Sequence, residues 1–266
     1  MSTKTRAVTR HLLKEYTQTL GWSYAIVLIV LVVLPVLFSL LTGEISKYDF
    51  ASNFANLNVG MIFGFVVFIL YALTYDNFKL LIQNGISRKT YWQARLSSLT
   101  IFSLFGTLIA FIYNYGIAAP LLNTTLQSKL NSTYYQPYSH FFGTQLLWNL
   151  LGNTLFTWIF FIALGTFGMA IGSIFALLTK FVRRLCFVVI PILGVFLLGF
   201  ISSVTVTHLN DRYAFDGFAN FVKFLVGYHA KNGYFNPWMP MATMIIGSVI
   251  TAAIAYCFNQ QLKIKN

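Results

Sequence analysis

The side chains of this 266-residue chain that could act as acids, bases or metal ligands are few and scattered. All six acidic residues lie in polar segments or at the ends of apolar stretches: Glu15, Glu44, Asp49, Asp76, Asp211 and Asp216. The four histidines, His11, His140, His208 and His229, have no spacing typical of a metal site. The sequence also contains no HExxH, no GxSxG and no phosphate-binding loop that ends in Lys-Ser/Thr. We therefore expect no catalytic residue, no metal site and no cofactor on this chain.

The composition is that of a membrane protein. Hydrophobic residues make up 57% of the chain and charged residues 9%, both outside the averages for soluble domains. The formal net charge of +12 is a feature of many nucleic-acid-binding proteins. Here the basic residues lie in short segments beside apolar stretches, where retention of Lys and Arg on the cytoplasmic side explains them. We expect a lipid environment and no nucleic acid partner.

Basic residues alternate along the polar segments, and this alternation predicts a topology. The first, third, fifth and seventh segments hold 4, 4, 3 and 2 Lys and Arg residues, whereas the second, fourth and sixth hold 1, 1 and 3. Because Lys and Arg near span ends stay in the cytoplasm, the odd-numbered segments are expected inside. The prediction is an all-α polytopic protein with both termini cytoplasmic, in a bacterial cytoplasmic membrane. Its six transmembrane helices are expected at about 22–41, 59–75, 96–122, 146–179, 185–207 and 239–258.

The expected domain organisation is one transmembrane domain with short ends. Residues 1–21 are basic and partly amphipathic, which is typical of a cytoplasmic interfacial helix, or alternatively of a disordered tail. Residues 22–258 would form the six-helix domain, with a kink at Pro35, and residues 259–266 a cytoplasmic tail. We expect neither a signal peptide nor a second folded domain.

Within the spans, the sequence offers packing residues rather than ionisable ones. No span carries Lys, Arg, Asp or Glu near its middle, which argues against a proton- or sodium-coupled transporter. Cys186 and Cys257 fall in apolar spans and are interpreted as packing residues. Close approach of helices is predicted at two small-xxx-small pairs, which are Gly60 with Gly64 and Gly168 with Gly172.

The segment from 208 to 238 departs from the alternation, because it is expected outside but holds three basic residues. It also has an apolar stripe at helical spacing, formed by Phe215, Phe218, Phe221, Val222 and Leu225. This stripe predicts one or two short re-entrant helices in the outer leaflet between spans five and six. The alternative, a further span starting near residue 218, is disfavoured by the shortness of the stretch and by Lys223.

The third polar segment, 76–95, is the best candidate for contact with a soluble partner. A helix that continues from span two is expected to stop at Asn84-Gly85, because Gly accepts the left-handed conformation that ends helices. Ser87 is then expected to cap a second helix that leads into span three. The result is a helical elbow with Ile86 exposed at its tip and Arg88 and Lys89 beside it. The alternative is an ordinary basic loop without a partner.

The same residues resemble a family. Gly85-Ile86-Ser87-Arg88-Lys89-Thr90-Tyr91-Trp92 is similar to the "G-(V/I)-S-R-x-x-(Y/F)" element that follows the second helix in permease subunits of ABC-2 type ABC transporters. The amphipathic N-terminal helix, the six spans and the outer re-entrant segment fit that family across nearly the whole chain. The length of span four and the lack of charged residues in the path are departures from a simple match.

The resemblance implies a function. The chain would be the permease half of an exporter that works as two permeases, identical or different, with a soluble ABC ATPase dimer that binds ATP and Mg. A coupling helix that contacts the ATPase would be formed by Asn84, Gly85, Ile86, Ser87, Arg88, Lys89, Thr90 and Tyr91. The expected cargo is amphipathic, such as an antimicrobial peptide, another antibiotic or a lipid-like molecule.

Two other functions remain open at this point. A stand-alone immunity or sensor protein of the membrane would act by binding and need no ATPase. A secondary transporter would show flux driven by an ion gradient, and the absence of ionisable residues from the spans argues against it.

Overall fold

The computed structural model describes residues 2–45, 48–73, 75–131, 133, 135–139, 141–143, 145–179, 181–186, 189, 192–193, 195–196, 216–229 and 235–262. These residues are mostly helical and contain no β-sheet beyond one isolated bridge between Tyr228 and Phe235. Four helical segments among them are long and apolar enough to cross a membrane: Thr3–Leu41, Arg88–Leu121, Leu146–Leu177 and Trp238–Gln261. The bent pair Val59–Ala72 and Asn77–Gln83 adds a fifth if it forms one span. The predicted all-α class is confirmed for the described residues, and the count of six membrane spans stays a prediction. Most of the predicted span 185–207 lies outside the described residues.

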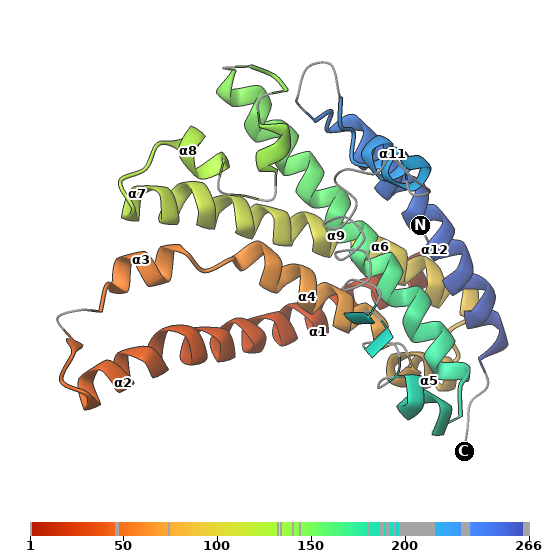
Figure 1. Cartoon of the computed structure of the whole chain (residues 1–266). Helices are drawn as coiled ribbons and strands as arrows, with labels where there is room; N and C mark the ends of the chain where they lie inside the picture. Colours follow the sequence, from red (N-terminus) through yellow and green to blue (C-terminus); the bar gives the residue numbers. More distant parts are fainter. Residues whose placement is uncertain are drawn as a thin grey trace.

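The segments predicted as the first two spans fold as a long hairpin (Figure 1). Helix α1 (Thr3–Leu28), the π-helix η1 (Ile29–Val33) and α2 (Leu34–Leu41) form its first arm. The short α3 (Phe50–Ala55) and α4 (Val59–Ala72) form the second, and α5 (Tyr75–Gln83) follows after a 45° bend. In Figure 1, α2 and α3 lie at one end of the molecule, here called the distal end, while α5 lies at the other, here called the elbow end.

Two π-helical segments each precede a proline. The segment η1 ends at Val33 and Pro35 follows as the second residue of α2; η3 (Ile112–Ala118) ends two residues before Pro120 in α7 (Ala119–Leu121). Proline has no N–H and its ring clashes with the carbonyl four residues earlier, and the wider π turn removes that clash. The kink predicted at Pro35 is thus accompanied by a π-helix before the proline.

The N-terminal segment forms a continuous helix with the first span. Its apolar face, with Val8, Leu12, Tyr16 and Leu20 buried, packs along α6 (Arg88–Phe111). The sequence predicts a cytoplasmic interfacial helix over residues 1–21. In the structure the apolar face of this segment lies against α6 of the same chain, and its position at a membrane surface stays a prediction.

The core of the molecule lies among α4, α6 and α9 (Leu146–Leu177), and α9 also packs along α12 (Trp238–Gln261). The predicted fourth span is one unbroken helix of 32 residues. At about 1.5 Å per residue it is longer than a bilayer core is thick.

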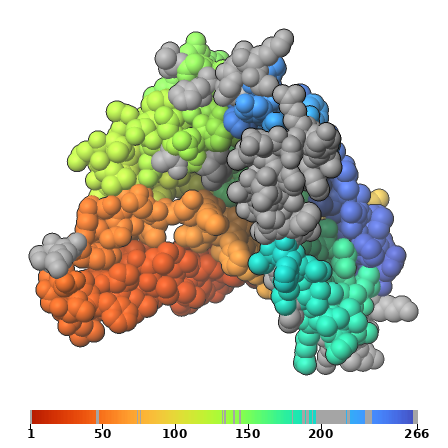
Figure 2. All heavy atoms as spheres, viewed as in Figure 1, coloured from red at the N-terminus to blue at the C-terminus, as the bar shows by residue number. Residues whose placement is uncertain are grey.

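At the distal end, α8 (Leu126–Leu130) and the 3-10 turn η4 (Gln136–Tyr138) cover the last turns of η3 and the start of α9 (Figure 1). An aromatic cluster holds them: Tyr135 and Tyr138 pack on Phe156 at ring distances of 5.7 and 5.3 Å. Burial raises the pKa of Tyr135 to about 12. In Figure 2 the orange surface of residues 50–73 adjoins the yellow-green surface of residues 112–131 at this end.

Candidate functional site

The elbow between α5 and α6 ends its first helix as the sequence predicts. Helix α5 stops at Gln83, and Gly85 has a φ of +76°. The Gly85 N–H bonds to the carbonyl of Ile82 at 3.0 Å, and the Ile86 N–H bonds to that of Leu81 at 3.1 Å. This pair of bonds is the Schellman motif, which requires a left-handed residue where Gly85 stands.

The second helix of the elbow begins as predicted too. Ser87 is extended, with φ −68° and ψ 149°, and its Oγ accepts a hydrogen bond from the Thr90 N–H at 3.1 Å. The bond satisfies one of the N–H groups that a helix start leaves open. The expectation that Ser87 caps α6 is therefore confirmed.

The tip of the elbow is polar rather than apolar. Asn84, Gly85, Ser87 and Lys89 are exposed, whereas Ile86 is half-buried and packs against the main core. The expectation of an exposed Ile86 is wrong, because the Schellman motif turns the residue after Gly85 back toward the preceding helix. Thr90 is half-buried as well. Among the predicted coupling residues, the most accessible to a partner are therefore Asn84, Gly85, Ser87 and Lys89.

Arg88 binds the end of the last helix of the chain. Its Nη1 donates to the carbonyl of Gln260, and its Nη2 donates to the carbonyl of Leu262 at 2.8 Å. Its guanidinium also lies 5.9 Å from the centre of the Phe78 ring. A cation at the carbonyl end of a helix is favourable because the helix dipole is negative there. Arg88, which the sequence predicts as a charge beside the elbow tip, thus connects the elbow to the end of α12 through hydrogen bonds.

Tyr91 is fully buried, although the sequence places it in the predicted coupling helix. Its ring packs edge-on against Phe78, with centroids 5.6 Å apart. Tyr91 therefore supports the elbow from inside and offers no surface to a partner, because the first turn of α6 already lies against α5.

A buried arginine lies one turn beyond Tyr91. Arg95 is 2% exposed, and its Nη2 donates to the carbonyl oxygen of Tyr71 at 2.6 Å. Its guanidinium lies over the rings of Tyr71 and Tyr91, at 5.5 and 5.6 Å. This places a cation at the carbonyl end of α4, where the helix breaks before α5. Sequence reasoning counted Arg95 only among the basic residues of the elbow.

The N-terminal helix joins the same cluster. The Tyr16 ring meets the Tyr71 ring edge-on at 5.0 Å, and the Tyr71 hydroxyl hydrogen-bonds to that of Ser98 at 3.0 Å. On the other side, the Asn77 side chain donates to Glu15 at 3.4 Å. Helices α1, α4 and α12 therefore contact the elbow that α5 and α6 form, directly or through Arg95.

One signal in the sequence could have indicated this network. Arg88, Tyr91 and Arg95 stand at i, i+3 and i+7, which is one face of a helix. A face on which arginines alternate with an aromatic residue is suited to cation–π packing. The helices that supply the partners could not be identified from that pattern.

The predicted packing glycines lie inside the molecule. Gly64 of α4 and Gly168 of α9 are in the contact between these two helices: a Cβ on Gly64 would meet Leu164, and one on Gly168 would lie 2.5 Å from the Phe68 carbonyl oxygen. Gly60 and Gly172 are buried as well. The structure thus places Gly64 and Gly168 across one helix pair rather than in two separate motifs.

The predicted outer segment is described in part. Phe215 lies outside the described residues, and Phe218 falls in α11 (Asp216–Leu225). Phe221 is 56% exposed and Leu225 is half-buried. The described part of this segment holds one short helix, where the sequence predicts one or two for the whole segment, and its re-entrant position in a membrane stays a prediction.

The described residues hold no group of three or more His, Cys, Asp or Glu side chains that could bind a metal ion. The elbow has an exposed polar tip and a buried base that contacts several helices. Comparison of the chain with family models, curated proteins and solved structures finds no match.

Proposed function

We propose that this chain is the permease subunit of an ATP-driven ABC-2 type exporter. In this proposal it has six membrane-spanning helices with both termini in the cytoplasm of a bacterial cell. It pairs with a second permease, identical or different, and the two bind a soluble ABC ATPase dimer that carries ATP and Mg. The cargo is an amphipathic molecule such as an antimicrobial peptide, another antibiotic or a lipid-like compound.

The observation that carries the proposal is the architecture of the elbow. Its exposed tip residues, Asn84, Gly85, Ser87 and Lys89, are small or polar, and Lys89 adds a positive charge, so the tip offers a polar surface to a soluble protein. Its base is fixed to α12 through Arg88 and to α4 through Arg95. A push on the tip would therefore move spans rather than bend a free loop. The sequence resemblance at Gly85 to Trp92 is the reason for proposing an ABC ATPase as that soluble protein.

Site-specific photo-cross-linking in native membranes tests the proposal. A photoreactive phenylalanine is placed at Lys89, which is exposed on the elbow, or at Lys223, which is exposed on α11. The proposal predicts that Lys89, but not Lys223, is linked to a soluble subunit with a phosphate-binding loop and measurable ATPase activity. A chain that functions without any ATPase, as an immunity or sensor protein would, contradicts it.

A further inference from the structure

Exposed aromatic side chains mark the end of the molecule at which α9 and α12 begin. Trp148, in the first turn of α9, is 54% exposed, and Trp238, the first residue of α12, is 52% exposed. The Phe142 ring lies between them, with its centroid 6.5 Å from each indole ring. Helices α9 and α12 pack along each other in the same direction (Figure 1), so the two tryptophans lie at one level. These three residues are here called the Trp238 anchor.

A second aromatic pair lies at the other end of α12. Tyr256 is 37% exposed, and its ring centroid lies 5.6 Å from that of Trp92, in the second turn of α6. Polar amide side chains follow at Asn259 to Gln261, where the helix ends. Trp92 and Tyr256 are here called the Trp92 anchor. Each end of α12 thus carries an aromatic residue that borders a polar segment.

The spacing of the two anchors along α12 matches the thickness of a bilayer core. Trp238 and Tyr256 are 18 positions apart in the sequence. At about 1.5 Å per residue this is roughly 27 Å, against a hydrocarbon core of about 30 Å. The exposed large side chains between them are all apolar: Met239, Ile245, Ile246, Val249, Ile250 and Ile254.

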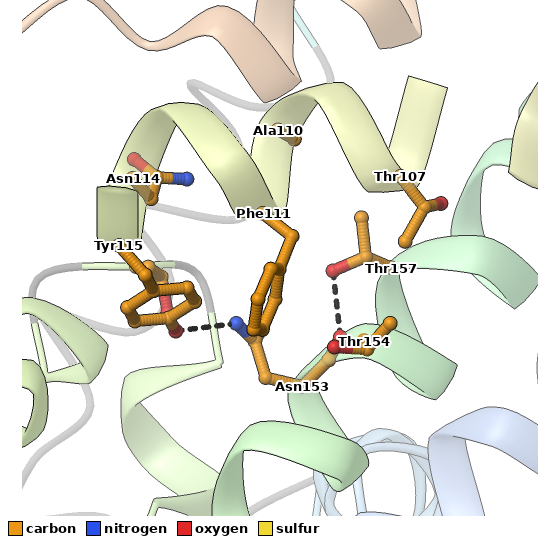
Figure 3. A pocket seen from close by; sticks show the side chains of 9 residues that line it. Thr107, Ala110, Phe111, Asn114, Tyr115, Asn153, Thr154 and Thr157 are labelled. Carbon is orange, nitrogen blue, oxygen red and sulfur yellow. Dashed lines mark hydrogen bonds between the residues drawn. The ribbon is translucent and has the colours of Figure 1, made fainter. Parts of the chain in front are cut away.

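The polar side chains of α9 face the protein instead. Its buried polar residues recur at every fourth position, at Asn149, Asn153 and Thr157. Figure 3 shows Asn153 and Thr157 on the side of α9 that faces η3 and the end of α6, and the Asn153 Nδ2 donates to the Tyr115 hydroxyl at 2.7 Å. Leu151, by contrast, is 52% exposed. Because polar groups are costly in hydrocarbon unless they are paired, this arrangement suits a helix with lipid on its outer side.

Trp158 provides a reference point between the anchors. It stands ten positions after Trp148 in α9, which is about 15 Å along the helix. Its Nε1 donates to the carbonyl oxygen of Thr100 in α6 at 3.2 Å. An indole N–H away from water needs such a partner. The bond is therefore what we expect of a tryptophan at the level of the hydrocarbon.

We propose that the two anchors bind the two interfaces of a lipid bilayer and so fix the depth of α9 and α12. Trp148 and Trp238 lie among the carbonyl groups and headgroups of one leaflet, and Trp92 and Tyr256 among those of the other. Indole and phenol rings suit this layer because each combines an apolar ring with a polar N–H or O–H. The proposal needs a bilayer but no ATPase, so it stands apart from the proposed exporter function.

Two other segments take their position from the anchors. Just past the end of α11, a Cβ on Gly227 would collide with the carbonyl oxygen of Asn236 before α12. Helix α11 therefore lies beside the interface of the Trp238 anchor, where an exposed Phe224 next to an exposed Lys223 is suited to the boundary between lipid and water. At the other interface, Lys89 stands about one turn before Trp92, so the elbow tip lies just outside the hydrocarbon.

Depth-dependent fluorescence quenching tests the proposal. Variants of the full chain that keep one tryptophan, with the others replaced by Phe, are reconstituted in phosphatidylcholine vesicles brominated near the headgroup or near the chain end. Trp148, Trp238 and Trp92 are expected to be quenched most by the shallow bromines, and Trp158 by the deep ones. Quenching of Trp148 or Trp238 mainly by the deep bromines overturns the proposal, and so does the absence of quenching at either depth.

A matched control lies on the same helix as Trp238. Ile246 is 61% exposed and stands eight positions further along α12, about 12 Å deeper in this proposal. With all native tryptophans replaced by Phe, Ile246→Trp should report a depth about 12 Å below that of Trp238. Equal depths for the two positions would contradict an interface at the start of α12.

A measurement on the chain with its five tryptophans keeps the test open if the Phe variants do not fold. The wild-type chain is labelled with 5-fluorotryptophan, and its fluorine NMR signals are assigned by single Trp→Phe variants. A nitroxide near the lipid headgroup should broaden the signals of Trp148 and Trp238 more than that of Trp158, and a nitroxide near the chain end should do the reverse. The same broadening of all three signals at both depths overturns the proposal.

Discussion

The Nη2 of Arg88, at the first residue of α6, lies 2.8 Å from the carbonyl oxygen of Leu262, just past the end of α12. The two residues are separated by 174 positions in the chain. The bond closes the molecule at its elbow end, so the elbow is the place where the start of the third predicted span meets the end of the last one.

Replacing Arg88 is expected to loosen the C-terminal turn. Arg88→Met removes a cation that satisfies two carbonyls at the end of α12, and we expect a loss of about 1–2 kcal/mol of stability. Hydrogen exchange should become faster in residues 255–262 and stay unchanged in the first half of α12. The neighbouring variant Lys89→Met serves as control, because Lys89 is exposed. Equal exchange in the two variants would show that Arg88 does not hold the helix end.

Removal of the buried guanidinium of Arg95 is expected to cost more. Arg95→Met removes the hydrogen bond to the Tyr71 carbonyl oxygen and two cation–π contacts, for an expected loss of about 3 kcal/mol. The measurement is the free energy of unfolding in a fixed detergent. Arg95→Lys should lose less, since it keeps a charge but not the planar fork. Arg10→Met, on the exposed side of α1, should change little; an effect as large as that of Arg95→Met would contradict the specific role of Arg95.

The packing of α4 on α9 depends on the absence of a side chain at Gly168. A Cβ there would lie 2.5 Å from the backbone oxygen of Phe68, so Gly168→Ala must push the helices apart and is expected to lower stability by about 1–3 kcal/mol. Gly247→Ala in α12 meets nothing within 4 Å and is expected to raise stability by up to about 1 kcal/mol through helix propensity. Both are measured by unfolding in the same detergent. Opposite signs are the expected result, and a neutral Gly168→Ala would refute the close contact.

A second close contact that leaves no room for a larger side chain lies between Gly152 and Tyr135. A Cβ on Gly152 would lie 2.5 Å from the Tyr135 hydroxyl oxygen, which is buried and has no hydrogen-bond partner among the described residues. Gly152→Ala is therefore expected to destabilise by about 1–3 kcal/mol. Tyr135→Phe removes the hydroxyl and should be close to neutral alone and restore much of the loss in the double variant. Additive losses in this double-mutant cycle would place the two residues out of contact.

Local features of the elbow were predictable because residues close in sequence determine them. Gly85 ends α5 through its left-handed backbone, and Ser87 begins α6 through its own side chain. Neither depends on a distant part of the chain. The half-buried position of Ile86 also follows from the Schellman motif, once its hydrogen bonds are considered rather than the charges beside it.

Contacts across the sequence could not be predicted in the same way. In the sequence, Arg88 and Arg95 are indistinguishable from other basic residues of a cytoplasmic segment. Their partners come from distant parts of the chain: the end of α12 for Arg88 and the end of α4 for Arg95. Likewise, the apolar face of residues 1–21 suits a membrane surface or a helix equally well, and the structure places it on α6. Asn153 stands in a row of polar residues four apart, a pattern that signals a polar interior but does not identify the facing helix.

The proposed coupling role of the elbow is tested by the ATPase rate of a purified complex between this chain and the proposed ABC ATPase. We predict that Lys89→Glu, which reverses the charge at the exposed elbow tip, lowers the permease-dependent ATPase rate about tenfold while the chain keeps its unfolding temperature. Lys223→Glu, equally exposed on α11, should leave the rate unchanged. An ATPase rate unaffected by Lys89→Glu, or full biological function of the chain with no ATPase present, would contradict the proposed exporter function.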